Sequence, residues 1–282
     1  MQDMYERLNL DVGRCEGKVG IEIEAEGLNL PRMSVNPDFL KTWKIERDGS
    51  LRGEDNAEYV LRKPCQFDEV GDVLNLIEEA ARQCGSTIDE SIRAGVHVHL
   101  NIQNYTPLEL LTFITTYYIL EDLFVHWCGK ERVGNHFCLR AADAEYVVGK
   151  ILETCQKKDW RVLNTENIRY TSLNLTSMFK YGSVEFRSMR STGDLGEIHM
   201  WTRLIEQLEK GARKFGNPKE VVHAMSEMNG PDRFIEYVME DLTEELLKYG
   251  KMSIMPAMRT IQPIAFMIDW DKFNKDKVNP FL

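Results

Sequence analysis

Carboxylate side chains occupy every second position of one short segment near the N-terminus. Glu22, Glu24 and Glu26 alternate with apolar residues in residues 18–26 (KVGIEIEAE), a pattern typical of a β-strand. Because successive side chains of a strand point to opposite faces, the three carboxylates share one face. Their mutual repulsion is relieved either by water on an exposed face or by a divalent cation with oxygen ligands. Both interpretations are open for this segment alone.

Two histidines show the same spacing in residues 95–102 (GVHVHLNI). His97 and His99 alternate with three apolar residues, so the two imidazoles share the polar face of a predicted strand. Such a pair is compatible with metal binding or phosphate contact, although surface histidines with ordinary polar partners are at least as common. No third histidine or cysteine lies nearby at zinc-like spacing, which argues against a tetrahedral zinc site.

A third alternating segment, residues 183–187 (SVEFR), places Glu185 and Arg187 together on its polar face. They form either a neutral pair on a solvated strand or a metal ligand beside a guanidinium suited to phosphate oxygens. Glu58 in AEYV offers a further carboxylate. Structural sheets rarely need carboxylates, imidazoles and a guanidinium on one side. If these strands are neighbours, we therefore expect that side to bind cations.

The elements that must position these residues are strands in the first hundred residues and mostly helices afterwards. Alternation and turn residues predict six strands, at residues 18–26, 42–47, 57–62, 95–102, 171–175 and 183–189. Apolar residues at helical spacing predict helices at residues 68–84, 107–127, 142–156, 195–215, 218–228 and 231–249. Strand pairs joined by turns, followed by helices, predict an α+β fold with a mainly antiparallel sheet.

The chain is predicted to form a single domain over residues 1–282, because no repeat, linker or charge block divides it. The segments that carry the candidate site residues all lie within residues 18–210. Residues 211–250 are expected to be helical. The last thirty residues contain three prolines and mixed polarity, so residues 251–282 are expected to form an extended tail on the surface.

The composition is that of an ordinary globular protein, with 43% hydrophobic and 28% charged residues among 282. The formal net charge of -10 disfavours general nucleic-acid binding, because nucleic-acid phosphates are also negative. No apolar run reaches the roughly 18 residues of a membrane helix, and the first residues lack a signal-peptide pattern. The six cysteines show no CxxC spacing, which favours reduced thiols. We therefore expect a cytoplasmic protein that does not contact membranes.

The order of these segments resembles that of a known enzyme family. GIEIE, DGS, EYV, AGVHVHL, RYTSLNL and SVEFRSMRSTGD, spread over residues 18–210, resemble the amidoligases of the glutamine synthetase and γ-glutamylcysteine ligase superfamily. The resemblance implies a glutamine synthetase catalytic-domain-like fold. In that fold a curved antiparallel sheet carries helices on its convex face and divalent cations on its concave face.

The resemblance also implies roles for individual residues. The implied metal ligands are Glu22, Glu24, Glu58, His97 and Glu185. His99 and Arg187 would act in catalysis by contacting ATP phosphate oxygens. Asp48 of the DGS turn is a candidate for the base that deprotonates the amine, or for binding its ammonium form. Candidates for binding substrate are Asp48, Ser50, Arg169, Ser172, Asn174 and Arg190, and ordinary polar contacts explain the last four of these about as well.

The implied activity is ATP- and Mg²⁺- (or Mn²⁺-) dependent joining of a carboxylate to an amine. The γ-phosphoryl group of ATP first moves to the carboxylate, and the amine then attacks the resulting acyl phosphate. The partners would be ATP, a carboxylate and an amine on a small molecule, peptide or protein side chain. Two alternatives are open: a divalent-metal hydrolase that uses the same residues, and an inactive binding protein that retains the fold.

Overall fold

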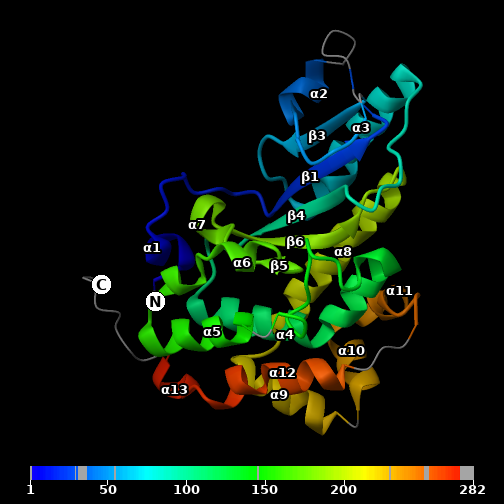
Figure 1. Ribbon diagram of the computed structural model, residues 1–282. Helices are drawn as coiled ribbons and strands as arrows, with labels where there is room; N and C mark the ends of the chain where they lie inside the picture. Colours follow the sequence, from blue (N-terminus) through cyan, green and yellow to red (C-terminus); the bar gives the residue numbers. More distant parts are fainter. Residues whose placement is uncertain are drawn as a thin grey trace.

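A single six-stranded sheet organises the described part of the chain. The computed structural model describes residues 2–28, 30, 37–53, 55–144, 146–228, 230–250 and 254–273. The strands are β1 (Val19–Glu26), β2 (Trp43–Glu46), β3 (Asn56–Leu61), β4 (Gly95–Asn101), β5 (Leu173–Asn174) and β6 (Ser183–Arg190). They pair antiparallel throughout in the order β2-β3-β1-β4-β6-β5 (Figure 1). The predicted α+β class with a mainly antiparallel sheet is therefore confirmed.

The strand register brings the chemically active side chains opposite one another. Glu22 of β1 pairs with His97 of β4, and Glu24 of β1 pairs with Glu58 of β3. His99 of β4 pairs with Glu185 of β6. Directly opposed residues of an antiparallel pair lie close together on one face. The polar faces of β1, β3, β4 and β6 are therefore a single continuous surface.

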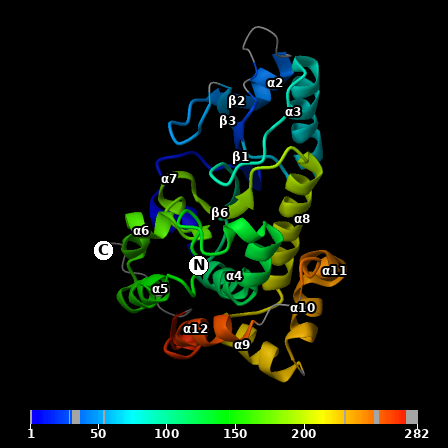
Figure 2. The same cartoon turned by 45° about the vertical axis from the view of Figure 1, so that its right-hand side comes forward.

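The opposite face of the sheet is apolar and is covered by long helices. α3 (Val70–Cys84) and α8 (Leu195–Ala212) pack against each other along one side of the sheet, as Figure 2 shows. α4 (Pro107–Trp127) contacts both α8 and β6. Phe186 of β6 meets Tyr117 and Phe113 of α4 edge to face, with ring centroids 5.1 and 6.2 Å apart. This aromatic packing fixes the apolar face inward and leaves the polar face free.

Shorter helices surround this core. They are α1 (Met4–Leu8), α2 (Pro37–Thr42), α5 (Tyr146–Lys157), α6 (Glu166–Arg169), α7 (Met178–Tyr181), α9 (Pro218–Glu227), α10 (Pro231–Met239), α11 (Thr243–Leu246), α12 (Met255–Phe266) and α13 (Trp270–Phe273). Single 3₁₀ turns lie at Phe67–Glu69, Lys130–Arg132, Trp160–Leu163 and Glu240–Leu242. No helix in the described ranges is both long and apolar enough to cross a membrane.

The C-terminal segment differs from the prediction of an extended tail. Residues 254–273 include the helices α12 and α13, and α12 packs on α4, α5 and α9 (Figure 1). Pro256 lies in the first turn of α12, where a missing N–H removes no helical bond. Ile261 and Ile264 are buried on the inner face of this helix. The prediction is wrong for these residues, while residues 251–253 and 274–282 lie outside the described ranges.

The helix predicted over residues 231–249 is interrupted. α10 ends at Met239, and Glu240, the first residue of the following 3₁₀ turn, has a positive φ of 49°; the short α11 comes after this turn. Periodicity alone did not reveal the break, because apolar residues continue at helical spacing on both sides of it.

A buried polar network lies behind the sheet on α4. The carboxylate of Glu121 accepts hydrogen bonds from the Ala141 backbone N–H at 2.8 Å and from the Ser172 hydroxyl, which in turn accepts one from Tyr117. Burial raises the pKa of Glu121 to about 8, although these hydrogen bonds oppose the shift. Ser172 is fully buried in this network and is not among the residues that line the cavity over the polar face. Ser172 therefore does not reach this cavity, and its contact with substrate stays a prediction.

Replacing Glu121 with Gln should stabilise the protein at alkaline pH. Between about pH 4.5 and 8 the folded state holds a proton on Glu121 that the unfolded chain has lost, so stability falls as pH rises. Glu121→Gln removes this dependence, because an amide donates to Ser172 and accepts from Ala141 without titrating. We expect its melting temperature to exceed that of the parent by at least about 3 °C at pH 8, with little difference at pH 5.

Thermal unfolding at several pH values measures this effect. Glu78→Gln, on the exposed side of α3, is the control for loss of a carboxylate and should follow the parent. Equal slopes of melting temperature against pH for the parent and Glu121→Gln would contradict the assignment.

Candidate active site

A cavity of about 1280 Å³ opens over the polar face of the sheet. It is lined by all but two, Ser172 and Arg190, of the residues predicted from sequence to ligate metal, catalyse or bind substrate within the family resemblance. The predicted residues that line it are Glu22, Glu24, Asp48, Ser50, Glu58, His97, His99, Arg169, Asn174, Glu185 and Arg187. Residues far apart in sequence therefore meet in one place. Their individual roles are still predictions.

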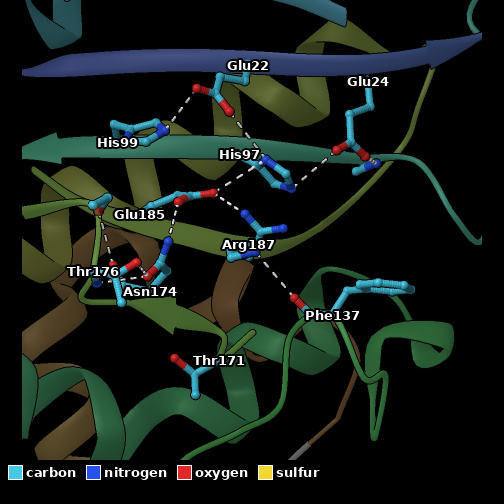
Figure 3. A network of polar contacts seen from close by, with 12 residues as sticks. Glu22, Glu24, His97, His99, Phe137, Thr171, Asn174, Thr176, Glu185 and Arg187 are labelled. Carbon is cyan, nitrogen blue, oxygen red and sulfur yellow. Dashed lines mark hydrogen bonds and ion pairs between the residues drawn. The ribbon is translucent and has the colours of Figure 1, made fainter. Parts of the chain in front are cut away.

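The floor of the cavity is the polar sheet face that carries Glu22, Glu24, Glu58, His97, His99, Glu185 and Arg187. His97 lies at the centre of this floor. Its Nδ1 is 3.5 Å from Glu22 Oε2 and 3.4 Å from Glu185 Oε1, and its Nε2 is 3.8 Å from Glu24 Oε1. Figure 3 shows these side chains pointing toward one another from the adjacent strands β1, β4 and β6. Glu24 Oε2 also accepts the Gly95 backbone N–H at 2.7 Å, which fixes that carboxylate at one end of the floor.

His99 is buried beside the other end of Glu22. Its Nδ1 is 3.0 Å from the Ser183 hydroxyl, and its Nε2 is 3.3 Å from Glu22 Oε1 without hydrogen-bond geometry. Burial disfavours the charged ring, but the contact with Glu22 and the charges of Glu22 and Glu185 together raise the pKa of His99. Nε2 is thus a buried nitrogen without a hydrogen-bond partner, directed at a carboxylate.

Glu185 and Arg187 are held by contacts on both sides. Arg187 Nη1 pairs with Glu185 Oε1, and Arg187 Nε donates to the Phe137 carbonyl at 3.3 Å (Figure 3). The Asn174 amide donates to Glu185 Oε2 at 2.6 Å, and its own oxygen accepts the Thr176 N–H at 2.8 Å. Burial opposes ionisation of Glu185, but the charges of His97 and Arg187 lower its pKa overall.

The carboxylates of the floor differ in how easily they ionise. Burial alone would raise the pKa of Glu22, but contacts with His97 and His99 hold it well below its usual range. Glu58 lacks such partners, so burial and the charges of Glu22, Glu24 and Asp48 raise its pKa to about 7. Negative charge is therefore concentrated at the Glu58 side of the floor.

The donor atoms fit divalent cations. Among the described residues, ligand atoms of Glu22, His99 and Glu185 lie within 4.8 Å of one another, as do those of Glu24, Asp48 and Glu58. The second set is all oxygen, which suits Mg²⁺, and the first adds one imidazole, which Mn²⁺ also accepts. The unpartnered Nε2 of His99 supports this fit, because such a nitrogen can donate its lone pair. Sequence reasoning had placed Asp48 at the substrate and His97, rather than His99, among the ligands.

Several cavity residues were missed by sequence reasoning. Arg132, His136 and Phe137 come from the loop after α4, and Lys180 comes from α7. Lys180 Nζ lies 4.5 Å from the centre of the Tyr181 ring. These residues belong to short turns without apolar periodicity, so the sequence offers no signal of their position apart from the Gly and Asn that mark a loop.

Arg190, like Ser172, is a predicted residue that does not line this cavity. Its Nη2 donates to both carboxylate oxygens of Glu197 at 2.8 and 2.6 Å, and its Nη1 donates to the Cys128 carbonyl at 3.1 Å. It lines a separate cavity together with residues of the loop after α4. We therefore withdraw Arg190 from the candidate substrate-binding residues.

Comparison with known families is consistent with this arrangement. Residues 32–209, more than half of the chain, match the model of a family described as "Putative amidoligase enzyme". A comparison with curated proteins found no match. The matched range includes Asp48, Glu58, His97, His99, Glu185 and Arg187, whereas β1 with Glu22 and Glu24 precedes it. The chain therefore belongs to this amidoligase family.

Proposed function

We propose that this protein is an ATP- and Mg²⁺-dependent carboxylate-amine ligase that acts through an acyl phosphate. The observation that carries the proposal is the pair of three-residue ligand sets, Glu22/His99/Glu185 and Glu24/Asp48/Glu58, in one cavity with Arg187 beside them. Two neighbouring cation sites beside a fixed guanidinium suit the transfer of a phosphoryl group, which depends mainly on positioning and charge neutralisation. Membership of an amidoligase family supports amide formation rather than hydrolysis as the reaction.

The residues that would hold Mg²⁺ are the two sets above, with His97 between them. Bound Mg²⁺ would neutralise phosphate charge and orient the γ-phosphoryl group toward the acceptor carboxylate. Arg187 would bind phosphate oxygens, and its contacts with Glu185 and the Phe137 carbonyl keep it oriented. The antiparallel sheet with its acidic face also supports the further proposal that the fold is of the glutamine synthetase catalytic-domain type.

The acid and amine substrates would occupy the rest of the cavity. Arg169 and Lys180 line it, and in the described part of the chain neither has a carboxylate within 4 Å, so both can bind an anionic group. Asp48 lies on the turn beside Glu24 and Glu58, where it can accept a proton from the attacking amine or bind its ammonium form. The six cysteines are free thiols, which supports a reducing compartment such as the cytoplasm.

Hydroxylamine trapping tests the acyl phosphate. With Mg²⁺, ATP, hydroxylamine and a panel of amino acids, dicarboxylic acids and peptides, we expect the parent to release ADP and form a hydroxamate from at least one acid. Glu22→Gln and Glu24→Gln should lower this rate at least about 100-fold, because each removes a charged ligand from the floor.

The matched control is Glu26→Gln on the same strand and face. Glu26 lies outside both ligand sets and accepts the Arg52 backbone N–H at 2.8 Å, a bond that a glutamine amide oxygen can keep. This variant should stay within about threefold of the parent. Hydroxamate formation without nucleotide would instead support a metal-dependent hydrolase, and a Glu22→Gln variant as fast as the parent would contradict the site.

Mg²⁺ affinity should rise with pH through neutrality. The pKa of Glu58 is about 7, so below that pH a cation must displace its proton before the carboxylate can ligate. We expect the apparent Kd for Mg²⁺ to fall about tenfold between pH 6 and pH 8, as measured by calorimetric titration. Glu58→Gln should bind Mg²⁺ more weakly and lose the part of this dependence that Glu58 contributes. Equal affinity of the parent at both pH values would show that Glu58 is not a ligand.

A further inference from the structure

Arg132 is a fully buried guanidinium whose charge is not directly paired. It ends the 3₁₀ turn Lys130–Arg132, is 2% exposed, and lines the main cavity. In the described ranges no carboxylate oxygen lies within 4 Å of its nitrogens, whereas Arg187 of the same cavity pairs with Glu185. Burying a charge without a partner is strongly unfavourable. Its position therefore calls for another explanation.

The hydrogen bonds of Arg132 go to the backbone of β6. Its Nε donates to the Ser188 carbonyl at 3.0 Å, and its Nη2 donates to the Arg187 carbonyl at 2.8 Å. These two residues form the bulge where the register between β4 and β6 shifts. A bulge leaves backbone groups without strand partners and redirects side chains, and bulges are common beside active sites. Arg132 satisfies both carbonyls of this bulge with a single planar group.

The contact is reciprocal, because the loop that carries Arg132 also holds the side chain of Arg187. Arg187 Nε donates to the carbonyl of Phe137, five residues after Arg132. The Asn135 N–H and the Cys138 thiol both donate to the Arg132 carbonyl, at 3.3 and 3.5 Å, which closes the loop on itself. Arg132 therefore holds the backbone of Arg187, and the loop that carries Arg132 holds the guanidinium of Arg187.

The guanidinium of Arg132 also lies close to the cavity floor. A Cβ placed on Gly95 would be 3.4 Å from Arg132 Nη2 and 3.6 Å from His97 Nε2, so the two groups approach the same point. His97 Nε2 in turn contacts Glu24. The buried positive charge thus lies near the acidic floor, and the attraction of these carboxylates helps to offset the missing direct partner.

We propose that Arg132 is a positioning residue of the reaction: by holding the bulge of β6 it orients Arg187, and with it Glu185, toward the phosphate groups. The inference rests on the proposed function, since it takes Arg187 as the phosphate contact. Arginine is required because only its planar fork reaches two carbonyls at once, whereas lysine offers a point charge.

Three variants in the full-length protein test the inference. Arg132→Gln removes the fork, Arg132→Lys keeps the charge, and Lys130→Gln removes a charge from an exposed position of the same turn. Calorimetry measures binding of Mg²⁺ alone and of the complex of Mg²⁺ with a nonhydrolysable ATP analogue. Hydrogen exchange detected by mass spectrometry follows the peptide that covers Ser183–Arg190.

Arg132→Gln should bind the nucleotide complex about tenfold more weakly and exchange faster over β6. Its affinity for Mg²⁺ alone should be unchanged or tighter, because a positive charge near the carboxylates has been removed. Arg132→Lys should recover part of the nucleotide affinity, and Lys130→Gln should match the parent. Equal weakening of Mg²⁺ and nucleotide binding would indicate a merely structural role and overturn the inference.

Parent-like nucleotide binding by Arg132→Gln would also overturn the inference. If the parent itself fails to bind the nucleotide complex, the proposed function is wrong. In that case hydrogen exchange still decides whether Arg132 holds β6: unchanged protection over Ser183–Arg190 in Arg132→Gln would refute it.

Discussion

The arrangement of the cavity depends on one electrostatic constraint: carboxylates from adjacent strands must share a poorly solvated floor without repelling one another. Glu22, Glu24 and Glu185 all lie within 4 Å of the His97 ring nitrogens. At such distances, and with little water, like charges destabilise a fold unless positive charge lies between them. Arg187 provides such charge beside Glu185, and the polar imidazole of His97 separates the three carboxylates. The same geometry makes the floor attractive to divalent cations, which provide more.

The sheet can maintain this floor because burial of its apolar face sets the strand register, which keeps the polar side chains on the cavity side. A one-residue slip of β4 would move both of its histidines to the apolar side and its valines to the cavity. The aromatic packing of Phe186 against α4 and the burial of Val96 and Val98 oppose that slip. The energy that holds the polar residues in register therefore comes largely from the opposite face. Removal of apolar contacts behind the sheet is expected to disturb the site in front of it.

Much of this could be predicted from sequence, because alternation with a period of two reveals both a strand and its polar face. This alternation assigns Glu22, His97 and Glu185 to polar faces without any knowledge of which strands are neighbours. Alternation does not reveal which strands pair, or that Asp48 of a turn meets Glu24 and Glu58.

Loop residues such as Arg132 carry no periodic signal, and the ion pair of Arg190 with Glu197 depends on how α8 packs. The prolines of the C-terminal segment favoured an extended tail, but one of them begins a helix.

The two ligand sets differ in a way that bears on how substrates would assemble. Glu22, His99 and Glu185 project from three adjacent central strands, and the pKa values of both carboxylates are lowered, so this set is ionised and held in place. The other set combines β1 and β3 with Asp48 of a turn, and it contains the one floor carboxyl, Glu58, whose pKa is raised. If cations bind as proposed, the two carboxylates of the first set need lose no proton near neutrality, whereas His99, whose pKa is raised, must release its proton before its nitrogen can ligate. The second requires loss of a proton from Glu58 and a ligand atom from Asp48 of the turn. Asp48 is also the candidate base. Binding of a cation by the second set would therefore place Asp48 where it can accept the proton of the amine.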